Sequence, residues 1–184
     1  MDIETKVPVL GFAAYSGTGK TTLLVNLIPL LKQQGIEVGV IKHAHHTFEI
    51  DQPGKDSYEI RKAGAKQMLI GSKKRWALMV EQEEKNLKDR LQEYISHIDQ
   101  DKLDLILVEG FKPEAIPKIE LHRPDLGYPL ICKTDDSVIA IATDADINEE
   151  TELPLLDLND YDAMVKYIME TFSLSKKTVA NSGS

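Results

Sequence analysis

The sequence has little cysteine, few clustered basic residues and no long apolar run, and each shortage excludes a class of protein. Cys132 is the single cysteine, so no disulfide can form within the chain, as is usual for proteins of a reducing cytoplasm. No apolar run approaches the roughly 20 residues that a membrane helix requires. The first residues also lack the basic and apolar regions of a signal peptide. We therefore expect a cytoplasmic protein that does not span a membrane.

Positive charge is also in short supply. The net charge is −8, and lysine and arginine cluster only at residues 73–75. A chain with this balance is not expected to have nucleic acid as its main partner. The acidic excess is equally unfavourable for a phosphate-bearing ligand. Any phosphate site must therefore be made locally, by backbone groups and a few well-placed cations.

One stretch, residues 7–24, supplies such a site. An apolar run of strand length, Val9 to Ala14, passes through a glycine-containing turn into a helical pattern that begins at Lys20. A strand, a glycine-rich turn and a helix in this order are the context of a P-loop, also called a Walker A motif. The residues predicted to hold phosphates are Ser16, Gly17, Thr18, Gly19, Lys20, Thr21 and Thr22.

Each residue type in this turn has a physical role. Gly17 and Gly19 allow backbone N–H groups to turn inward with no Cβ in the way, and the helix that follows presents its free N–H groups and positive dipole end to an anion. Lys20 can reach the outer phosphates, and the Thr21 hydroxyl can bind Mg²⁺. Ala14 departs from the pattern because it stands where the first glycine is usual. Alanine is the mildest replacement, so we expect binding to survive.

Apolar strand patterns alternate with helical patterns along the rest of the chain. This alternation predicts an α/β fold, a single P-loop NTPase domain over residues 1–175 with a mostly parallel sheet and helices on both faces. A hairpin at residues 67–71 and 76–80 and an edge strand at 118–121 could make the sheet mixed. Residues 176–184 are predicted to be a disordered tail.

The carboxyl ends of parallel strands gather at one edge of the sheet, where ligands bind. Glu109 ends the apolar strand 103–108 and precedes Gly110, which is where P-loop proteins keep a second acidic group. We expect Glu109 to be catalytic together with Lys20, either by holding Mg²⁺ through water or by polarising an attacking water. Asp104, at the start of that strand, is expected at the opposite edge.

A histidine-rich segment follows the second predicted strand. It reads Lys42-His43-Ala44-His45-His46, with Asp51 beyond it. These side chains could form a transition-metal site, a solvated turn or, as we prefer, a binding surface for a second, anionic substrate through Lys42, His43 and His46. Asp51 or Asp56 in the next loop could reach the Mg²⁺ ion.

The base of the nucleotide is harder to assign. Guanine is commonly recognised by a loop of the pattern [NT]-K-x-D, and two degenerate versions occur, at residues 132–135 and 143–146. The first keeps the lysine and Asp135, whereas the second lacks the lysine but follows a stronger strand. We favour the second on position, with Asp144 or Asp146 contacting the base, and Asp135 remains the alternative.

Several segments together resemble one family. They are A-A-Y-S-G-T-G-K-T-T-L-L, I-K-H-A-H-H, D-Q-P-G-K-D-S-Y-E-I-R-K-A-G-A, R-W-A-L-M and L-D-L-I-L-V-E-G-F-K, in this order. The combination is similar to the molybdopterin-guanine dinucleotide biosynthesis protein B family, over nearly the whole chain. The P-loop alone would indicate little, because many unrelated activities share it.

The resemblance implies a function that the residues alone do not. It implies a cytoplasmic homodimer that binds GTP with Mg²⁺, hydrolyses it weakly and helps attach GMP to molybdopterin. The partners would be molybdopterin or its guanine dinucleotide and the nucleotidyltransferase of the pathway, protein A. By position, residues 17–22 would hold the phosphates, Thr21 the Mg²⁺, Glu109 would be the second acidic group, and residues 42–46 and 51–57 would form loops over the cleft.

Two other functions fit a P-loop fold. A small-molecule kinase usually closes an arginine-bearing lid over the phosphates, but the four arginines of the chain, at 61, 75, 90 and 123, are scattered. A metal carrier could use the histidines. No arginine finger or catalytic glutamine stands near the P-loop in sequence, so we expect hydrolysis to be slow.

Overall fold

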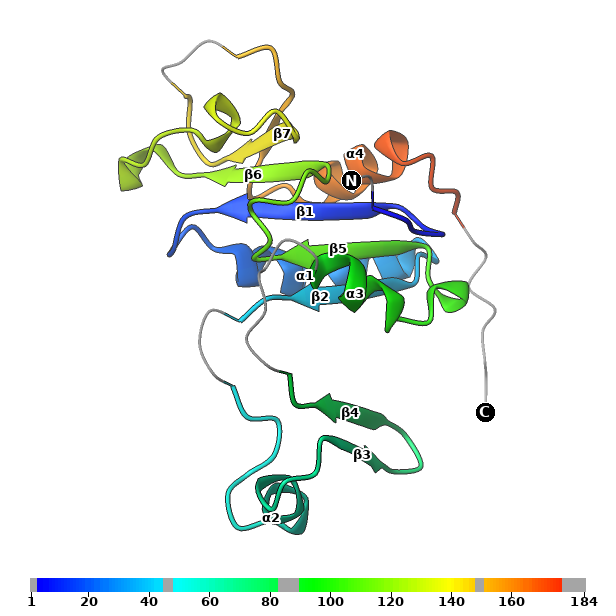
Figure 1. The fold of residues 1–184 in the computed structure, drawn as a ribbon. Helices are drawn as coiled ribbons and strands as arrows, with labels where there is room; N and C mark the ends of the chain where they lie inside the picture. The colour runs from blue at the N-terminus through cyan, green and yellow to red at the C-terminus, as the bar shows by residue number, and fades with distance from the viewer. Residues whose placement is uncertain (1–2, 45–47, 83–89, 148–150, 177–184) are drawn as a thin grey trace. The chain divides into compact units, whose positions relative to one another are not determined.

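The computed structural model describes residues 3–44, 48–82, 90–147 and 151–176 (Figure 1). The chain divides into two compact units, which we call the sheet unit (residues 1–43 and 88–184) and the hairpin unit (residues 44–87). The single P-loop domain expected over residues 1–175 stays a prediction. The predicted tail at 176–184 lies almost entirely outside the described residues.

Helices and strands alternate along the sheet unit, as the sequence predicts. Its helices and strands are β1 (Val9–Ala14), α1 (Lys20–Gln33), β2 (Val38–Lys42), α3 (Arg90–Ser96), β5 (Leu105–Glu109), β6 (Lys118–His122), β7 (Val138–Thr143), β8 (Leu155–Asp157) and α4 (Tyr161–Thr171). Short 3₁₀ turns occupy Gln100–Lys102, Pro124–Leu126 and Ile131–Lys133.

The six strands of this unit form one sheet in the order β2-β5-β1-β6-β7-β8. Every neighbouring pair is parallel, and the arrowheads of β1, β2, β5, β6 and β7 point the same way in Figure 1. The predicted α/β fold with a mostly parallel sheet is confirmed. Strands β2 and β5, which follow β1 in the chain, both lie on one side of β1. Strand β6, which follows β5, lies on the other side of β1. The turn after β1 therefore lies at the point where the winding direction changes, which is where open α/β sheets bind ligands.

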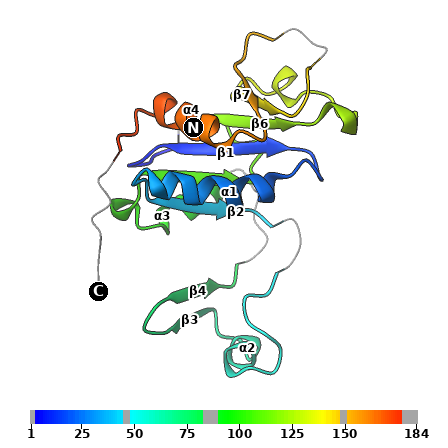
Figure 2. The ribbon, with the colours of Figure 1, turned by 180° about the vertical axis from the view of Figure 1, so that it is seen from behind.

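Helices cover both faces of the sheet, as predicted. Strand β5 is apolar on both sides: Leu105 and Leu107 face the core under α1 and α4, while Ile106 and Val108 face the core under α3. Figure 1 is seen from the α3 side, and Figure 2 from the α1 side. Burying each large aliphatic side chain contributes about 1.5–3 kcal/mol, so two apolar layers hold the central strands firmly.

The expected edge strand at 118–121 is wrong in its position. Strand β6 lies between β1 and β7, and all five of its residues are buried. Its charged residues suggested exposure, but each is satisfied internally. Lys118 Nζ donates to Asp135 (2.9 Å) and Ser137 (2.6 Å), and the Glu120 carboxylate accepts the N–H groups of Ile131 (2.7 Å) and Cys132 (2.9 Å). The edge strands of the sheet are β2 and β8, and the sequence did not reveal β8.

The last helix has a side-chain cap at its start. Asp160 is the N-cap of α4, and its carboxylate accepts the N–H of Ala163 at 2.9 Å. A side-chain acceptor at this position satisfies one of the free N–H groups of the first turn. Helix α4 then packs Met164, Val165 and Ile168 into the core that it shares with α1.

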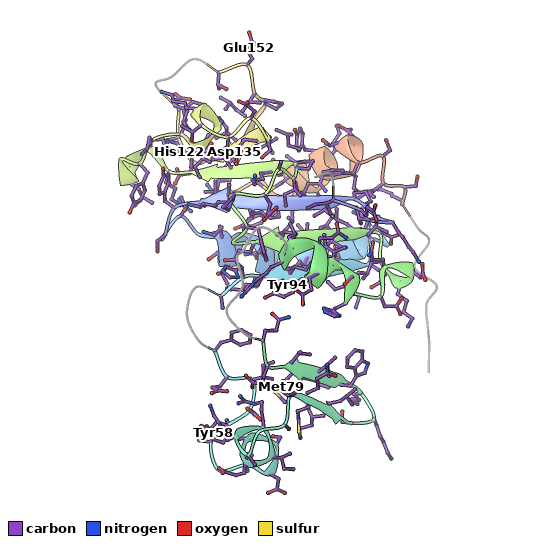
Figure 3. The ribbon with its side chains drawn as sticks, viewed as in Figure 1. Tyr58, Met79, Tyr94, His122, Asp135 and Glu152 are labelled. Atoms are coloured by element: carbon purple, nitrogen blue, oxygen red, sulfur yellow. The ribbon has the colours of Figure 1, made fainter. Side chains whose placement is uncertain are left out.

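The hairpin unit contains the predicted hairpin and a short helix. Strands β3 (Gln67–Gly71) and β4 (Trp76–Val80) are antiparallel and form a sheet of their own, so they do not make the main sheet mixed. Helix α2 (Asp56–Lys62) precedes them. Figure 3 labels Tyr58 on α2 and the buried Met79 on β4. The charged centre of this unit is Arg61, which pairs with Glu49, Asp51 and Glu81.

Candidate nucleotide-binding site

The turn after β1 has the backbone of a phosphate-binding loop. Gly17 and Gly19 have φ values of 82° and 99°, a region in which a side chain is strained. Ala14 lies at the end of the strand and, unlike the two glycines, is not among the described residues with positive φ. The alanine that departs from the motif therefore causes no strain there, and its carbonyl oxygen accepts a hydrogen bond from Lys20 Nζ (3.4 Å).

The N–H groups of this turn are unpaired in the part of the chain that the structure describes. From residue 16 to residue 22, none donates to a described backbone or side-chain acceptor, and Gly19, the N-cap of α1, supplies no side chain to cap it. Such a run of donors at a helix N-terminus, with the helix dipole behind it, favours an anion. The residues predicted to hold phosphates, Ser16 to Thr22, all lie in this run, which fits a polyphosphate group.

Three lysines and one carboxylate gather beside the loop. Lys42 Nζ lies 3.3 Å from Glu109 Oε2, at the ends of the neighbouring strands β2 and β5. Burial lowers the pKa of Lys20 below its usual 10.5, and Glu109 opposes this decrease. Lys112 and Lys42 lower the pKa further by repulsion. An excess of positive charge thus accumulates at this edge, although the chain as a whole is acidic.

Glu109 lies where the sequence predicts it. It is the last residue of β5, its side chain is only 13% exposed, and Lys42 is its partner. Asp104, as expected, lies at the other end of β5, where its carboxylate accepts the N–H of Glu37 at 3.0 Å. Glu109 and Thr21 are the residues that could hold Mg²⁺ at this edge, and their metal and catalytic roles remain predictions. Among the described residues, no group of three or more His, Cys, Asp or Glu could hold a metal ion.

Gly110 brings the ends of β2 and β5 together. Its φ is 93°, and a Cβ there would lie 2.9 Å from the carbonyl oxygen of His43. The N–H of His43 in turn donates to the Glu109 carbonyl at 2.9 Å. The His43 ring lies 5.3 Å from that of Phe111, so His43 is at the predicted edge. His45 and His46 lie outside the described residues.

Asp51, predicted to reach Mg²⁺, belongs to the hairpin unit. Its carboxylate is 2.8 Å from the Arg61 guanidinium, and both side chains are 8% exposed. The hydrogen bond from Arg61 lowers the pKa of Asp51 below its usual 3.8. The structure thus gives Asp51 a partner within its own unit, and its role toward a metal remains a prediction.

The two candidate guanine loops lie at opposite ends of β7. Asp144 follows the carboxyl end of β7, whereas Asp135 precedes its amino end and binds the buried Lys118. Because the phosphate loop lies at the carboxyl edge, Asp135 is far along the sheet from it. Figure 3 labels Asp135 and also His122, the last residue of β6. His122 is largely buried beside Thr143 in the strand register, and the sequence did not single it out.

The sequence also missed Arg123, the residue that follows β6. Its Nε donates to the carbonyl oxygen of Thr18 at 3.0 Å, and its guanidinium pairs with Asp144. The two residues are 105 positions apart in the chain. The contact could have been predicted only from the knowledge that β6 lies beside β1. An arginine that looked isolated in sequence therefore lies on the phosphate loop.

Two aromatic rings border the same loop. Tyr15 and Tyr128 stack with ring centroids 4.5 Å apart and planes 10° from parallel, an arrangement worth roughly 0.5–1.5 kcal/mol. Lys112 Nζ lies 4.6 Å from the centre of the Tyr15 ring, within the range of a cation–π contact. These contacts hold Lys112 close to the loop, where its charge acts on Lys20.

The chain matches known proteins over most of its length. Residues 9–144 match the model of the family described as molybdopterin guanine dinucleotide synthesis protein B. The chain is 51% identical over 168 residues to the molybdopterin-guanine dinucleotide biosynthesis adapter protein of Escherichia coli K12, covering 91% of this chain and 94% of that protein. It is 42% identical over 166 residues to the protein of the same name from Haemophilus influenzae, covering 90% of each.

A solved structure supports the fold. The crystal structure of Bacillus subtilis MobB aligns with a TM-score of 0.67 and 24% identity, covering 90% of this chain and 98% of that one. Within the described residues, no helix has both the length and the apolar character to cross a membrane. On the family model and the two close relatives, this chain belongs to the molybdopterin guanine dinucleotide synthesis protein B family.

Proposed function

We propose that this protein is a GTP-binding accessory protein that supports the attachment of GMP to molybdopterin, with weak GTP hydrolysis of its own. The observation that carries the proposal is the run of unpaired N–H groups from residue 16 to residue 22, next to Lys20 at the switch point of the sheet. The names of the two close relatives support the pathway. The partners we propose are molybdopterin or its guanine dinucleotide and the nucleotidyltransferase of the pathway, in the cytoplasm, with the protein as a homodimer.

The residues at the carboxyl edge have separate roles in this proposal. The N–H groups of the loop bind the phosphates, and the Lys20 ammonium neutralises the outer ones. Mg²⁺, held by Thr21 and Glu109, would supply further positive charge to the phosphate oxygens. Lys42 and His43 would face a second, anionic substrate.

Slow hydrolysis follows from the state of Arg123, the arginine that contacts the loop in the described residues. Arg123 donates to the Thr18 carbonyl and pairs with Asp144, so its charge is already neutralised. P-loop proteins without a free arginine finger leave transition-state charge uncompensated and turn over slowly. The protein is therefore better suited to holding a nucleotide than to consuming it.

Guanine recognition is assigned to Asp146 rather than to Asp144. Both lie in the predicted loop after β7, but the Asp144 carboxylate pairs with Arg123, whereas Asp146 is exposed. A carboxylate that recognises guanine must accept from the ring N–H and the exocyclic amine. Asp146→Asn should therefore reduce the preference for GTP over ATP.

The test is a calorimetric titration of GTP, ATP and GDP, with and without Mg²⁺. We expect the wild type to bind GTP more tightly than ATP, and Lys20→Ala to weaken binding at least tenfold, as the loss of a charge-assisted contact predicts. Lys32→Ala, in the last turn of the same helix, removes the same charge and should bind as the wild type does. Glu109→Gln should keep the affinity but slow hydrolysis. A preference for ATP would contradict the proposal.

A further inference from the structure

Arg123 joins the phosphate loop to the end of β7. Its Nε donates to the Thr18 carbonyl oxygen, and one terminal nitrogen pairs with Asp144, which follows the last residue of β7. The other terminal nitrogen would lie 3.6 Å from a Cβ placed on Gly19. The guanidinium thus lies directly against the Thr18–Gly19 peptide unit.

This contact determines which way that peptide unit faces. In a trans peptide the C=O and the N–H point in opposite directions within one plane, and the described residues contain no cis peptide. Because Arg123 binds the Thr18 carbonyl, the Gly19 N–H must point away from the guanidinium. Among the described residues this N–H has no acceptor, so it is free to bind an anion.

Without such a contact the unit could turn over. Glycines on both sides of Thr18 have positive φ, and glycine adopts both signs of φ with almost no steric cost. A reversed Thr18–Gly19 unit would present a carbonyl oxygen to the phosphates instead of an N–H. The Thr18 hydroxyl donates to the Tyr15 carbonyl, which fixes the start of the turn, but it does not fix the peptide that follows Thr18.

We propose that Arg123 is a positioning residue that holds the Thr18–Gly19 peptide in its phosphate-binding orientation, and that Asp144 holds Arg123 in place. This inference rests on the proposed nucleotide binding, and it gives Asp144 a role other than recognition of the base. The guanidinium suits the role because its planar fork can donate to a carbonyl and a carboxylate together, which an ammonium does less well. The Arg123 and Asp144 side chains are 34% and 27% exposed, so the pair contributes little to folding itself.

The role predicts a loss of affinity that is independent of the base. The loop N–H groups bind phosphates whatever the base, so Arg123→Ala should weaken GTP, GDP and ATP by the same factor, about tenfold for one charge-assisted contact. The ratio of GTP to ATP affinity should stay at its wild-type value. Asp144→Asn should weaken all three nucleotides about threefold, since a neutral amide orients the guanidinium less firmly.

Calorimetric titrations with Mg²⁺ on the full chain test this. The variants are Arg123→Ala, Arg123→Lys, Asp144→Asn and the double variant Arg123→Ala with Asp144→Asn. We expect Arg123→Lys to recover part of the affinity and the double variant to bind like Arg123→Ala alone. Lys102→Ala is the matched control, because it removes a cation before the amino end of β5, where Lys102 pairs with Asp99 in an exposed contact.

Two further readouts separate positioning from other roles. The melting temperature of Arg123→Ala without nucleotide should lie close to that of the wild type, because a role in folding would lower it. Any fall in its rate of GTP hydrolysis at saturating GTP should be smaller than the tenfold loss of affinity, since a positioning role acts mainly through binding. A rate that falls with unchanged affinity would make Arg123 catalytic and would overturn the proposal.

The outcomes also distinguish this inference from the proposed function. If the wild type binds none of the three nucleotides, the proposed function fails and the inference fails with it. If the wild type binds and Arg123→Ala binds equally tightly, the inference alone fails. A selective loss of GTP with Asp144→Asn, with ATP unaffected, would restore Asp144 as the residue that recognises the base and would also overturn the inference.

Discussion

Strands β6 and β7 carry an ion pair at each end, and the two pairs have opposite surroundings. At the carboxyl ends, Arg123 and Asp144 are both partly exposed, and Arg123 contacts the phosphate loop. At the amino ends, Lys118 is 2% exposed, and its ammonium is bound by Asp135, Ser137 and the carbonyl oxygen of Glu114. The same two strands thus place one pair against the phosphate loop and bury the other in the fold.

The comparison shows that position along a strand, rather than residue type, separates binding from folding. A buried pair that loses one partner leaves an uncompensated charge in a medium of low dielectric. An exposed pair is screened by water and contributes at most about 1 kcal/mol. We therefore expect changes at the amino ends to reduce stability, and changes at the carboxyl ends to reduce nucleotide affinity.

The largest expected effect is that of Lys118→Met, which keeps most of the side-chain volume but removes the charge. Asp135 and the Glu114 carbonyl lose their donor, so the free energy of unfolding should fall by about 3 kcal/mol. For a chain of this length the melting temperature should then fall by roughly 6–12 °C. Thermal unfolding followed by circular dichroism measures this. Lys102→Met, which breaks only an exposed pair with Asp99, is the control and should leave the free energy of unfolding close to that of the wild type. An equal effect of both substitutions would contradict the comparison.

Gly110→Ala is an exception to this division, because Gly110 lies at the carboxyl edge and yet is expected to affect stability. The added Cβ would lie 2.9 Å from the His43 carbonyl at a φ of 93°, so we expect a loss of about 1–3 kcal/mol. Gly127→Ala is the control: its φ is also positive, at 68°, but no atom lies within 4 Å of the new Cβ. Chemical denaturation of both variants isolates the clash. If Gly127→Ala is as destabilised as Gly110→Ala, the backbone conformation alone accounts for the loss.

A smaller effect is expected in acid. Burial raises the pKa of Asp135, but the hydrogen bonds from Ser137 and Lys118 outweigh it and leave the pKa below the usual 3.8. A depressed carboxyl pKa contributes stability that is fully present above 3.8 and is lost as the pH falls through the pKa of the folded state. Asp135→Asn should therefore flatten the decline in stability below pH 4. Denaturation curves between about pH 2.5 and pH 6, on either side of 3.8, measure this decline. If Asp135→Asn loses stability in acid as steeply as the wild type, other carboxylates control acid unfolding.

The sequence predicted best what depends on local pattern. The strand, turn and helix from Val9 to Gln33 have their expected bounds, and Glu109 ends β5 as expected. The placement of β6 was wrong because alternating Lys118 and Glu120 resemble the exposed face of an edge strand. Lys118 and Glu120 meet their partners only in the folded chain. These partners are Asp135 and the N–H groups of Ile131 and Cys132, and nothing in the local sequence pattern reveals them.

The candidate site divides in the same way. Its contiguous part, Ser16 to Thr22, follows from a sequence motif, and its phosphate contacts stay a prediction. The contact of Arg123 with Thr18 joins two elements that are adjacent only because β1 pairs with β6, so finding it required the strand order. The positions of Lys112 and Tyr128 around Tyr15 depend on the same long-range packing. Motifs therefore predicted the backbone of the candidate phosphate site, and the fold revealed the side chains that contact it.

The most direct test of the account is a thermal-shift measurement with GTP and Mg²⁺ on the wild type, Lys118→Met and Arg123→Ala. At GTP about one hundred times the wild-type Kd, binding should stabilise the wild type and Lys118→Met by about 2.7 kcal/mol, and Arg123→Ala by only about 1.4 kcal/mol if its affinity is tenfold weaker. Without GTP, only Lys118→Met should melt early. A normal GTP shift in Arg123→Ala, or a lost shift in Lys118→Met, would contradict the division between a carboxyl edge that binds and an amino edge that folds.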